Sequence, residues 1–128
     1  MEEPIWVREE VAIAIHRRQL AEHGGRDGIR DPGLLSSAMA RPQNLLAYSK
    51  EPPDLAALAA AYAYGIARQH PFVDGNKRTA WVVARLFLPL NGHDLKASQE
   101  EKYRTMMVLA AGSLSEAQFA DWIRAHLR

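Results

Sequence analysis

The hydrophobic positions in the first third of the chain recur at the three- and four-residue spacing of amphipathic helices. From Pro4 to Gly25 this spacing predicts a first helix, which glycine ends. Asp31 followed by Pro32 is typical of a helix start, with an N-cap and a proline in the first turn. The pair predicts a short second helix that ends before Pro42.

Residues 42–53 mix prolines and polar residues with two leucines, and no helical period continues through them. This composition predicts a surface loop or a small extended flap. Exposed leucines on such a loop would invite a partner, but a loop that folds its leucines onto the core is the commoner arrangement.

Two strongly apolar segments in the middle of the chain predict the next two helices. Asp54 caps a helix over residues 55–69, which stops there because Pro71 disfavours helical angles at the residue before it. Another helix begins near Asn76 and continues to Leu90 with apolar residues on nearly every face. Such a helix is expected to be central and buried.

The last third of the chain carries two capping boxes, in which a serine and a glutamate or glutamine three residues later satisfy each other's backbone N–H groups. The pairs are Ser98 with Glu101 and Ser115 with Gln118, and they place the last two helices at about 98–111 and 115–127. No strong strand pattern and no internal repeat occurs. The sequence therefore predicts one all-α domain over residues 1–128, a compact bundle of about six helices with a small flap.

Composition narrows the possible functions. A length of 128 residues suits one core, and the net charge of +1 provides no field that would hold a nucleic acid or an anionic membrane. The absence of cysteine excludes disulfides, thiolate metal sites and cysteine nucleophiles. The longest uncharged apolar stretch, 55–67, is shorter than the roughly 20 residues that span a bilayer, and Glu2 and Glu3 do not suit a secretory signal. We therefore expect a cytoplasmic protein that binds no membrane and, by itself, no nucleic acid.

Chemically active side chains are concentrated between the two most apolar helices. The segment from His70 to Thr79 contains one imidazole, one carboxylate, one amide and two cations. The first turn of the helix that begins near Asn76 offers free backbone N–H groups and the positive end of the helix dipole. Together with Lys77 and Arg78, this turn predicts a binding site for phosphate groups.

The same segment contains candidates for metal binding and proton transfer. Asp74 offers oxygen ligands of the kind that Mg²⁺ takes alongside substrate phosphates. Gly75 allows a tight turn and leaves its N–H accessible. Imidazole titrates near neutrality, which suits His70 to accept the proton of a protein hydroxyl that attacks phosphorus.

Each of these residues also has a purely structural interpretation. Taken alone, His70 is more often a helix-capping histidine than a catalyst, and Asp74 or Asn76 would pass as an N-cap. Lys77 and Arg78 fit this interpretation poorly. Two cations at the positive end of a helix cost about 0.3–1 kcal/mol each unless an anion neutralises them.

The string from His70 to Arg78 resembles the motif of the Fic/Doc superfamily, which runs histidine, any residue, phenylalanine, any residue, acidic residue, small residue, asparagine, glycine or lysine, arginine. Lys77 makes the string similar to the Doc branch, whose members are toxins of bacterial toxin–antitoxin pairs. The resemblance extends over most of the chain and includes residues 28–35. It implies a fold of the Fic/Doc type.

The resemblance also implies a role for each motif residue. His70 would be the catalytic base and Asp74 the Mg²⁺ ligand. The flap at about 43–53 would lay a target segment beside the motif by adding backbone hydrogen bonds. The residues expected to bind the nucleotide are Arg68, Gly75, Asn76, Lys77 and Arg78.

Two departures from the AMP-transferring members bear on the reaction. Lys77 replaces a glycine that makes room for the distal phosphates, and Trp81 stands where those proteins carry a second arginine. The resemblance therefore implies a protein kinase that uses Mg²⁺ and ATP to phosphorylate elongation factor Tu and thereby blocks translation. Protein AMP transfer and a catalytically silent regulatory subunit are the alternatives.

Many Fic proteins contain an inhibitory helix, which is marked by serine or threonine followed four residues later by glutamate. No such pair occurs in this chain. Inhibition is therefore expected from a separate antitoxin chain that binds near the active site.

Overall fold

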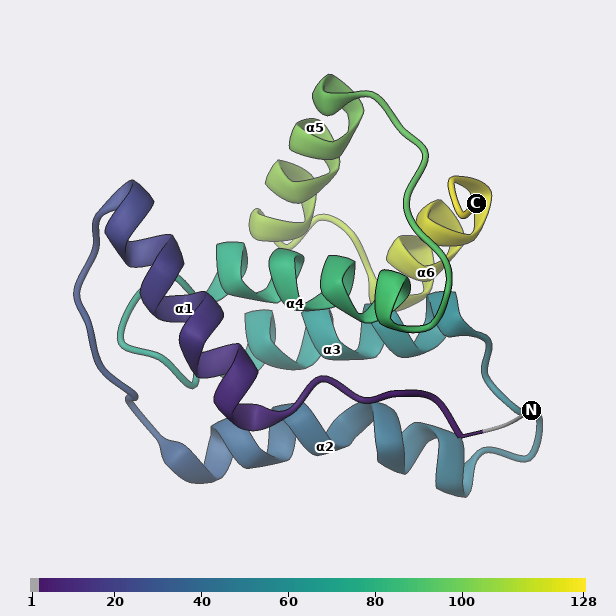
Figure 1. The fold of residues 1–128 in the computed structure, drawn as a ribbon, viewed down its shortest axis with the longest axis horizontal. Helices are drawn as coiled ribbons and strands as arrows, with labels where there is room; N and C mark the ends of the chain where they lie inside the picture. The colour runs from purple at the N-terminus through teal and green to yellow at the C-terminus, as the bar shows by residue number, and fades with distance from the viewer. Residues whose placement is uncertain (1–2) are drawn as a thin grey trace.

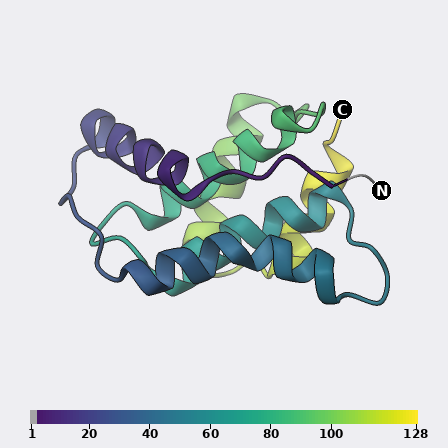
Figure 2. The ribbon, with the colours of Figure 1, turned by 60° about the horizontal axis from the view of Figure 1, so that its bottom comes forward.

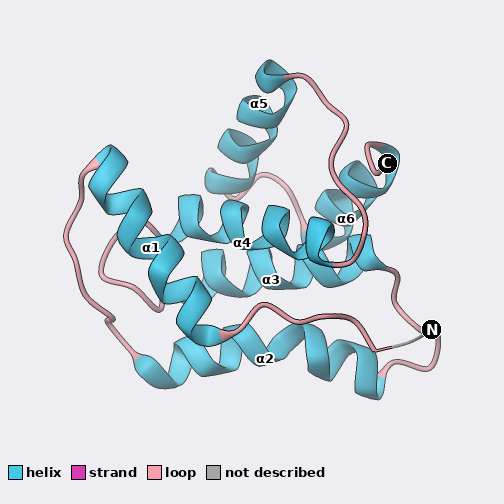
Figure 3. Cartoon of the chain, viewed as in Figure 1, coloured by secondary structure: helices cyan, strands magenta, loops and turns pink. Residues whose placement is uncertain are grey.

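The computed structural model describes residues 3–128, and within them the chain forms six helices and no β-strand (Figures 1 and 3). The helices are α1 (Glu9–His23), α2 (Pro32–Tyr48), α3 (Leu55–Gln69), α4 (Asn76–Leu90), α5 (Gln99–Ala110) and α6 (Glu116–Ala125). The predicted all-α fold of about six helices is confirmed, as are the predicted bounds of α3 and α4.

α3 lies at the centre of the fold, packed against α2, α4 and α6 (Figure 1). Nine of its fifteen residues are buried, most of them alanines. Small side chains let the neighbouring helices approach closely. A Cβ atom at Gly65 would lie only 3.3 Å from the carbonyl oxygen of Ala38, so glycine at this position permits the observed contact with α2.

The second helix is longer than the sequence predicts. α2 continues through Pro42 to Tyr48, so the predicted end before Pro42 is wrong. The proline deprives the carbonyl of Ala38 of its helical partner. Packing outweighs this loss, because Pro42 is buried and both Leu45 and Leu46 pack against the core in the following turn. The leucines thus pack against the core, as in the commoner of the two arrangements considered for this segment.

The predicted flap at about 43–53 does not form. Residues 43–48 are helical, and residues 49–54 connect α2 to α3. This connection lies at the N-terminal end of α3, whereas His70 follows the C-terminal end, about 22 Å away along a helix of this length (Figure 1). The 49–54 connection is therefore not placed to lay a target segment beside His70.

The first helix begins at Glu9, later than the predicted Pro4. The preceding residues are extended, and side chains from elsewhere in the fold bind their backbone. The Tyr62 hydroxyl accepts a hydrogen bond from the N–H of Val7 at 3.0 Å, and Asn91 Oδ1 accepts one from the N–H of Ile5 at 2.8 Å. Burial raises the pKa of Tyr62 to about 12. These bonds replace those that a helix would supply.

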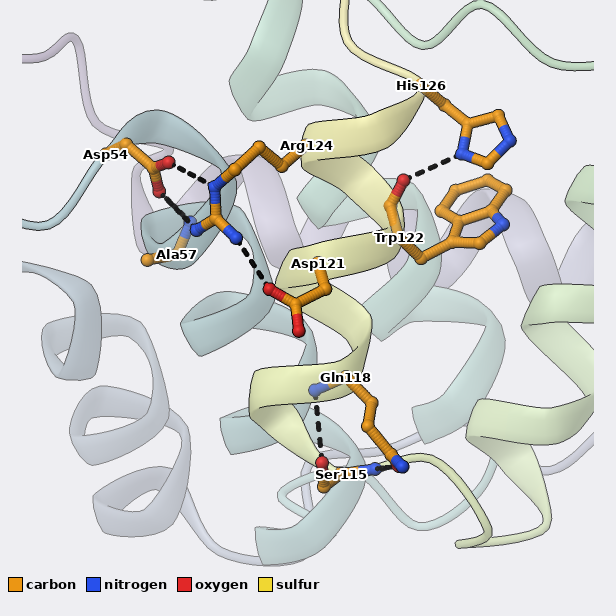
Figure 4. A network of polar contacts seen from close by, with 8 residues as sticks. All are labelled: Asp54, Ala57, Ser115, Gln118, Asp121, Trp122, Arg124 and His126. Carbon is orange, nitrogen blue, oxygen red and sulfur yellow. Dashed lines mark hydrogen bonds and ion pairs between the residues drawn. The ribbon is translucent and has the colours of Figure 1, made fainter.

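α6 is joined to the start of α3 by a shared guanidinium (Figure 4). Arg124 donates to the two oxygens of Asp54 at 2.6 and 3.0 Å and to Asp121 at 2.7 Å. Asp54 also accepts from the N–H of Ala57 at 2.9 Å and so caps α3, as predicted. The hydrogen bond from Arg124 holds the pKa of the Asp54 carboxyl below its usual value.

Both predicted capping boxes form, one at Ser98 and the other at Ser115, where Gln118 completes it (Figure 4). They begin α5 and α6 within a residue of the predicted positions. Among the described residues, none of the helices combines the length and the apolar character that a bilayer span requires.

Candidate functional site

The loop between α3 and α4 is held by the connection between α1 and α2, which lies beside it at one end of the molecule (Figures 1 and 2). The N–H of Arg30 donates to the carbonyl of Pro71 at 2.7 Å, and the N–H of Val73 donates to that of Gly28 at 3.0 Å. Gly28 has a φ of 127°, which favours glycine. The stretch 28–35 noted in the sequence therefore begins with the segment that fixes this loop.

Phe72 and Asn76 close the loop from the inside. Phe72 is buried and fixes the loop to the core. The Asn76 side chain is also buried. Its Oδ1 accepts from the N–H of Phe72 at 2.9 Å, and its Nδ2 donates to the Phe72 carbonyl at 3.0 Å. Because the amide oxygen and the amide nitrogen each bond the Phe72 backbone, the Asn76 side chain fixes the shape of the loop.

A histidine that the sequence reasoning missed supports the loop from α1. His16 is buried and stacks on Phe72, with ring centroids 3.9 Å apart and an interplanar angle of 7°. Its Nε2 donates to the carbonyl oxygen of Asp74 at 2.7 Å. The only signal in the sequence is its spacing of four from Ala12, the other buried residue of α1.

The loop and the C-terminal end of α1 form a pocket of about 460 Å³. From α1, Leu20 and His23 contribute to its wall. The four charged or ionisable motif residues are exposed there, namely His70, Asp74, Lys77 and Arg78. The pocket brings together six of the seven residues predicted for the site: His70, Asp74, Gly75, Asn76, Lys77 and Arg78.

Arg68, the seventh, lies outside this pocket. Its guanidinium stacks on the ring of Tyr64, with the carbon 4.9 Å from the ring centroid. Both residues line a separate pocket of about 210 Å³, which shares only His70 and Lys77 with the larger one. The structure therefore does not place Arg68 with the other residues predicted to bind the nucleotide, because its side chain turns back along α3.

The first turn of α4 faces the larger pocket without a cap. Its N-cap residue, Gly75, has a φ of 74° and no side chain, and a Cβ there would lie 3.3 Å from Leu20. No acidic residue lies in this turn, which carries Lys77 and Arg78 instead. By contrast, side chains cap α2, α3, α5 and α6. The positive end of the α4 dipole and its free N–H groups are thus available to an anion.

The Asp74 carboxylate is oriented by two backbone groups. The N–H of Gly75 donates to Oδ1 at 2.9 Å, and the N–H of Arg26 lies 3.3 Å from Oδ2. Each oxygen keeps a lone pair for a further ligand. Within residues 3–128 no group of three or more histidine, aspartate or glutamate side chains could hold a metal ion. Asp74 could therefore bind Mg²⁺ only together with phosphate oxygens and water, which is the usual mode for that ion.

His70 ends α3 in the left-handed conformation, with φ 52° and ψ 56°, and no other non-glycine residue from 3 to 128 has a positive φ. Arg30 donates to its carbonyl from Nε at 2.7 Å. The imidazole lines the pocket and forms no hydrogen bond with the described part of the chain. Its ring nitrogens are therefore free to meet a substrate.

The chain matches one known protein family and is similar to two proteins of known name. The model of the Fic/DOC family matches residues 6–88, which include every residue of the larger pocket. The chain is 37% identical over 118 residues to the protein kinase Doc of Escherichia phage P1, covering 92% of each chain. It is 49% identical over 74 residues to the toxin Doc of Mycolicibacterium smegmatis, covering 58% of this chain and 57% of the relative.

Proposed function

The chain belongs to the Fic/DOC family, in its Doc branch, and from that premise we propose that it is a toxin that phosphorylates a protein hydroxyl with Mg²⁺ and ATP. One observation carries the proposal: a single pocket brings His70 and the Asp74 carboxylate to the uncapped first turn of α4. The names of the two relatives, a protein kinase and a toxin, agree with it.

The groups around the pocket suit the phosphates of ATP. The free N–H groups of the first α4 turn would bind phosphate oxygens, and Lys77 and Arg78 would neutralise their charge. Asp74 would complete a magnesium site with those oxygens. When bound, the ion would stabilise the negative charge that develops on the phosphate oxygens during transfer. These placements remove the energetic objection to two cations at the start of a helix.

His70 is positioned to act on the incoming hydroxyl. In the proposed transfer the hydroxyl oxygen forms a bond to the γ-phosphorus, the bond from that phosphorus to the ADP oxygen breaks, and the hydroxyl proton passes to the imidazole. The exposed, unbonded imidazole beside the phosphate-binding turn supports this role. Phosphoryl transfer needs positioning and charge neutralisation rather than a covalent intermediate on the protein, and the pocket offers both.

Two positions favour transfer of phosphate over transfer of AMP. Lys77 lines the pocket, where the AMP-transferring relatives have glycine. Trp81 is buried and packs against Phe119, with ring centroids 6.0 Å apart. An indole in the core offers no guanidinium to bind distal phosphates, so the second arginine of those relatives has no replacement at this position.

Elongation factor Tu is the proposed target, and a separate antitoxin chain in the cytoplasm is the proposed inhibitor. Both follow from membership of the Doc branch, and the antitoxin is further supported by the absence of the serine- or threonine-to-glutamate pair of self-inhibited relatives. Phosphorylation of this factor would block translation.

The experiment that tests the proposal uses purified elongation factor Tu with ATP labelled on either the α- or the γ-phosphate. The expected result is label on the factor from γ-labelled ATP alone, with an intact mass that corresponds to added phosphate. Label from α-labelled ATP would instead identify an AMP transferase. A protein that fails to bind Mg-ATP in calorimetry would be a silent regulatory subunit.

A further inference from the structure

We propose that His16 is a positioning residue: through its hydrogen bond to the Asp74 carbonyl it sets the orientation of the Asp74–Gly75 peptide, and so the face that the loop turns toward an anion. The identity of the anion that binds at that face rests on the proposed function. The orientation of the peptide does not rest on that function, because it is a property of the loop itself.

The geometry of one peptide links His16 to the pocket. The Asp74 carbonyl points inward and accepts from His16 Nε2 at 2.7 Å. In a trans peptide the C=O and the following N–H point in opposite directions. The N–H of Gly75 is therefore directed outward, where it bonds the Asp74 carboxylate at 2.9 Å. One bond inside the protein thus orients both an N–H donor and a carboxylate outside it.

Without this bond, the peptide would have freedom to rotate. Gly75 adopts a φ of 74°, and glycine accepts positive and negative φ almost equally. A rotated peptide would present its carbonyl oxygen to the pocket and withdraw the N–H. A carbonyl oxygen turned toward the pocket would add to the repulsion of phosphate, and the Asp74 carboxylate would lose the N–H that orients it, so the peptide orientation affects how well the loop accepts an anion.

Packing alone does not explain a histidine at this position. Burying a polar ring costs free energy unless the ring is hydrogen-bonded, and an apolar ring could stack on Phe72 equally well. What the imidazole adds is its N–H donor. The nearly parallel stack on Phe72, at 3.9 Å and 7°, holds the ring plane so that this donor meets the Asp74 carbonyl.

Two substitutions separate the donor from the ring. His16→Phe keeps an aromatic ring against Phe72 and removes the donor, whereas His16→Gln keeps an N–H donor and removes the ring. The measurements are the affinity for Mg-ADP by calorimetry and the chemical shift of the Gly75 amide by NMR. We expect about tenfold weaker binding and a displaced Gly75 amide in His16→Phe, and partial recovery of both in His16→Gln.

His126 provides a matched control. It makes the same two kinds of contact as His16, because its Nδ1 donates to the carbonyl of Trp122 at 2.7 Å and its ring stacks on the Trp122 indole at 4.5 Å (Figure 4). Its Nε2 also lies 3.3 Å from the Glu101 carboxylate. It follows the last residue of α6, however, and does not line the pocket. His126→Phe should lower the melting temperature but leave both the Mg-ADP affinity and the Gly75 amide unchanged.

Three results would overturn the inference. A folded His16→Phe with the parent's affinity and an unmoved Gly75 amide would make His16 a packing residue. Equal losses in His16→Phe and His16→Gln would show that the donor is not decisive. If His16→Phe does not fold, the same comparison is made between His16→Gln and His16→Met, and equal behaviour again contradicts the inference. Failure of the parent to bind Mg-ADP would refute the proposed function, while the Gly75 amide would still report the peptide orientation.

Discussion

Arg30 holds His70 by its backbone: Nε donates to the His70 carbonyl at 2.7 Å, while a terminal nitrogen of the same guanidinium donates to the Gln69 carbonyl at 2.8 Å. A cation that bonds the last carbonyls of a helix is favoured by the helix dipole. Because His70 has a left-handed φ of 52°, its conformation needs this support. Arg30 thus fixes the point from which the imidazole projects into the pocket.

Arg30→Lys should therefore slow transfer without weakening nucleotide binding. Lysine keeps the charge, but its single ammonium group cannot reproduce the fixed fork that bonds two carbonyls. A displacement of His70 by a fraction of an ångström should lower the rate by roughly tenfold. The measurements are phosphate transfer and Mg-ATP calorimetry. Arg18→Lys, at an exposed ion pair with Glu22, is the control, and a parent-like rate in Arg30→Lys would refute the positioning role.

His70→Ala should abolish transfer and leave nucleotide binding nearly intact. The imidazole is proposed to accept the proton of the incoming hydroxyl, so its loss should lower the rate by about 100-fold or more. No phosphate contact is removed. Transfer assays and calorimetry on the same preparation separate the two effects. A folded variant that no longer binds ATP would instead make His70 a ligand-binding residue.

The Asp54–Arg124 pair predicts how stability depends on pH. The Arg124 hydrogen bond lowers the pKa of Asp54 below its usual 3.8. A group whose pKa is lower in the folded state contributes stability above its unfolded value, and this contribution is lost as the pH falls through the folded value. The loss should therefore appear below about pH 4. It should be at most about 1 kcal/mol, because both side chains are half-exposed.

Arg124→Met tests this prediction. Without the guanidinium the pKa of Asp54 should rise toward its usual value, so the variant should lose less stability than the parent between about pH 5 and pH 3. Melting temperatures across that range and an NMR titration of the Asp54 carboxyl provide the measurement. Arg104→Met, which removes an exposed pair with Glu100, is the control. Parallel pH profiles for parent and Arg124→Met would contradict the assignment.

The elements that the sequence predicts correctly are those whose determinants are local. α3, α5 and α6 begin directly after the N-cap residues Asp54, Ser98 and Ser115, because each of these side chains bonds an N–H only three residues away. α2 is different. The local effect of proline, which is to end a helix before it, is outweighed by the burial of Pro42 and by the contacts of Leu45 with the core. This packing depends on where α3 lies.

The site likewise contains residues whose placement is set by the local sequence and residues whose placement is set by contacts between distant parts of the chain. The pocket residues between His70 and Arg78 share one loop and one helical turn, so their meeting in one pocket follows from the sequence alone. His16 and Arg30 reach this loop from 58 and 40 residues away, and no local pattern marks either contact. The direction of Arg68 is likewise decided by attraction to Tyr64, a contact that the motif spacing does not encode.

Lys77 is the position that we expect to distinguish phosphate transfer from AMP transfer. It lies in the first turn of α4 and lines both the larger pocket and the smaller pocket beside Arg68. A lysine there fills space and places a positive charge at the uncapped first turn of α4. It should therefore decide which phosphorus atom of the nucleotide can lie opposite His70.

Lys77→Gly should sharply reduce phosphate transfer and permit at least a trace of AMP transfer, because it opens the volume that the AMP-transferring relatives leave free. Full conversion is not expected, since the buried Trp81 cannot act as a second phosphate-binding arginine. Glycine in the first turn should lower the folding stability by less than about 1 kcal/mol, and loss of a cation from the positive end of α4 offsets part of this loss.

Lys77→Met, which keeps most of the side-chain volume without the charge, separates the effect of volume from the effect of charge. The products are identified by mass spectrometry of the target. If Lys77→Gly phosphorylates as fast as the parent and yields no AMP adduct, lysine does not set the nucleotide orientation, and the preference for a kinase loses its main support.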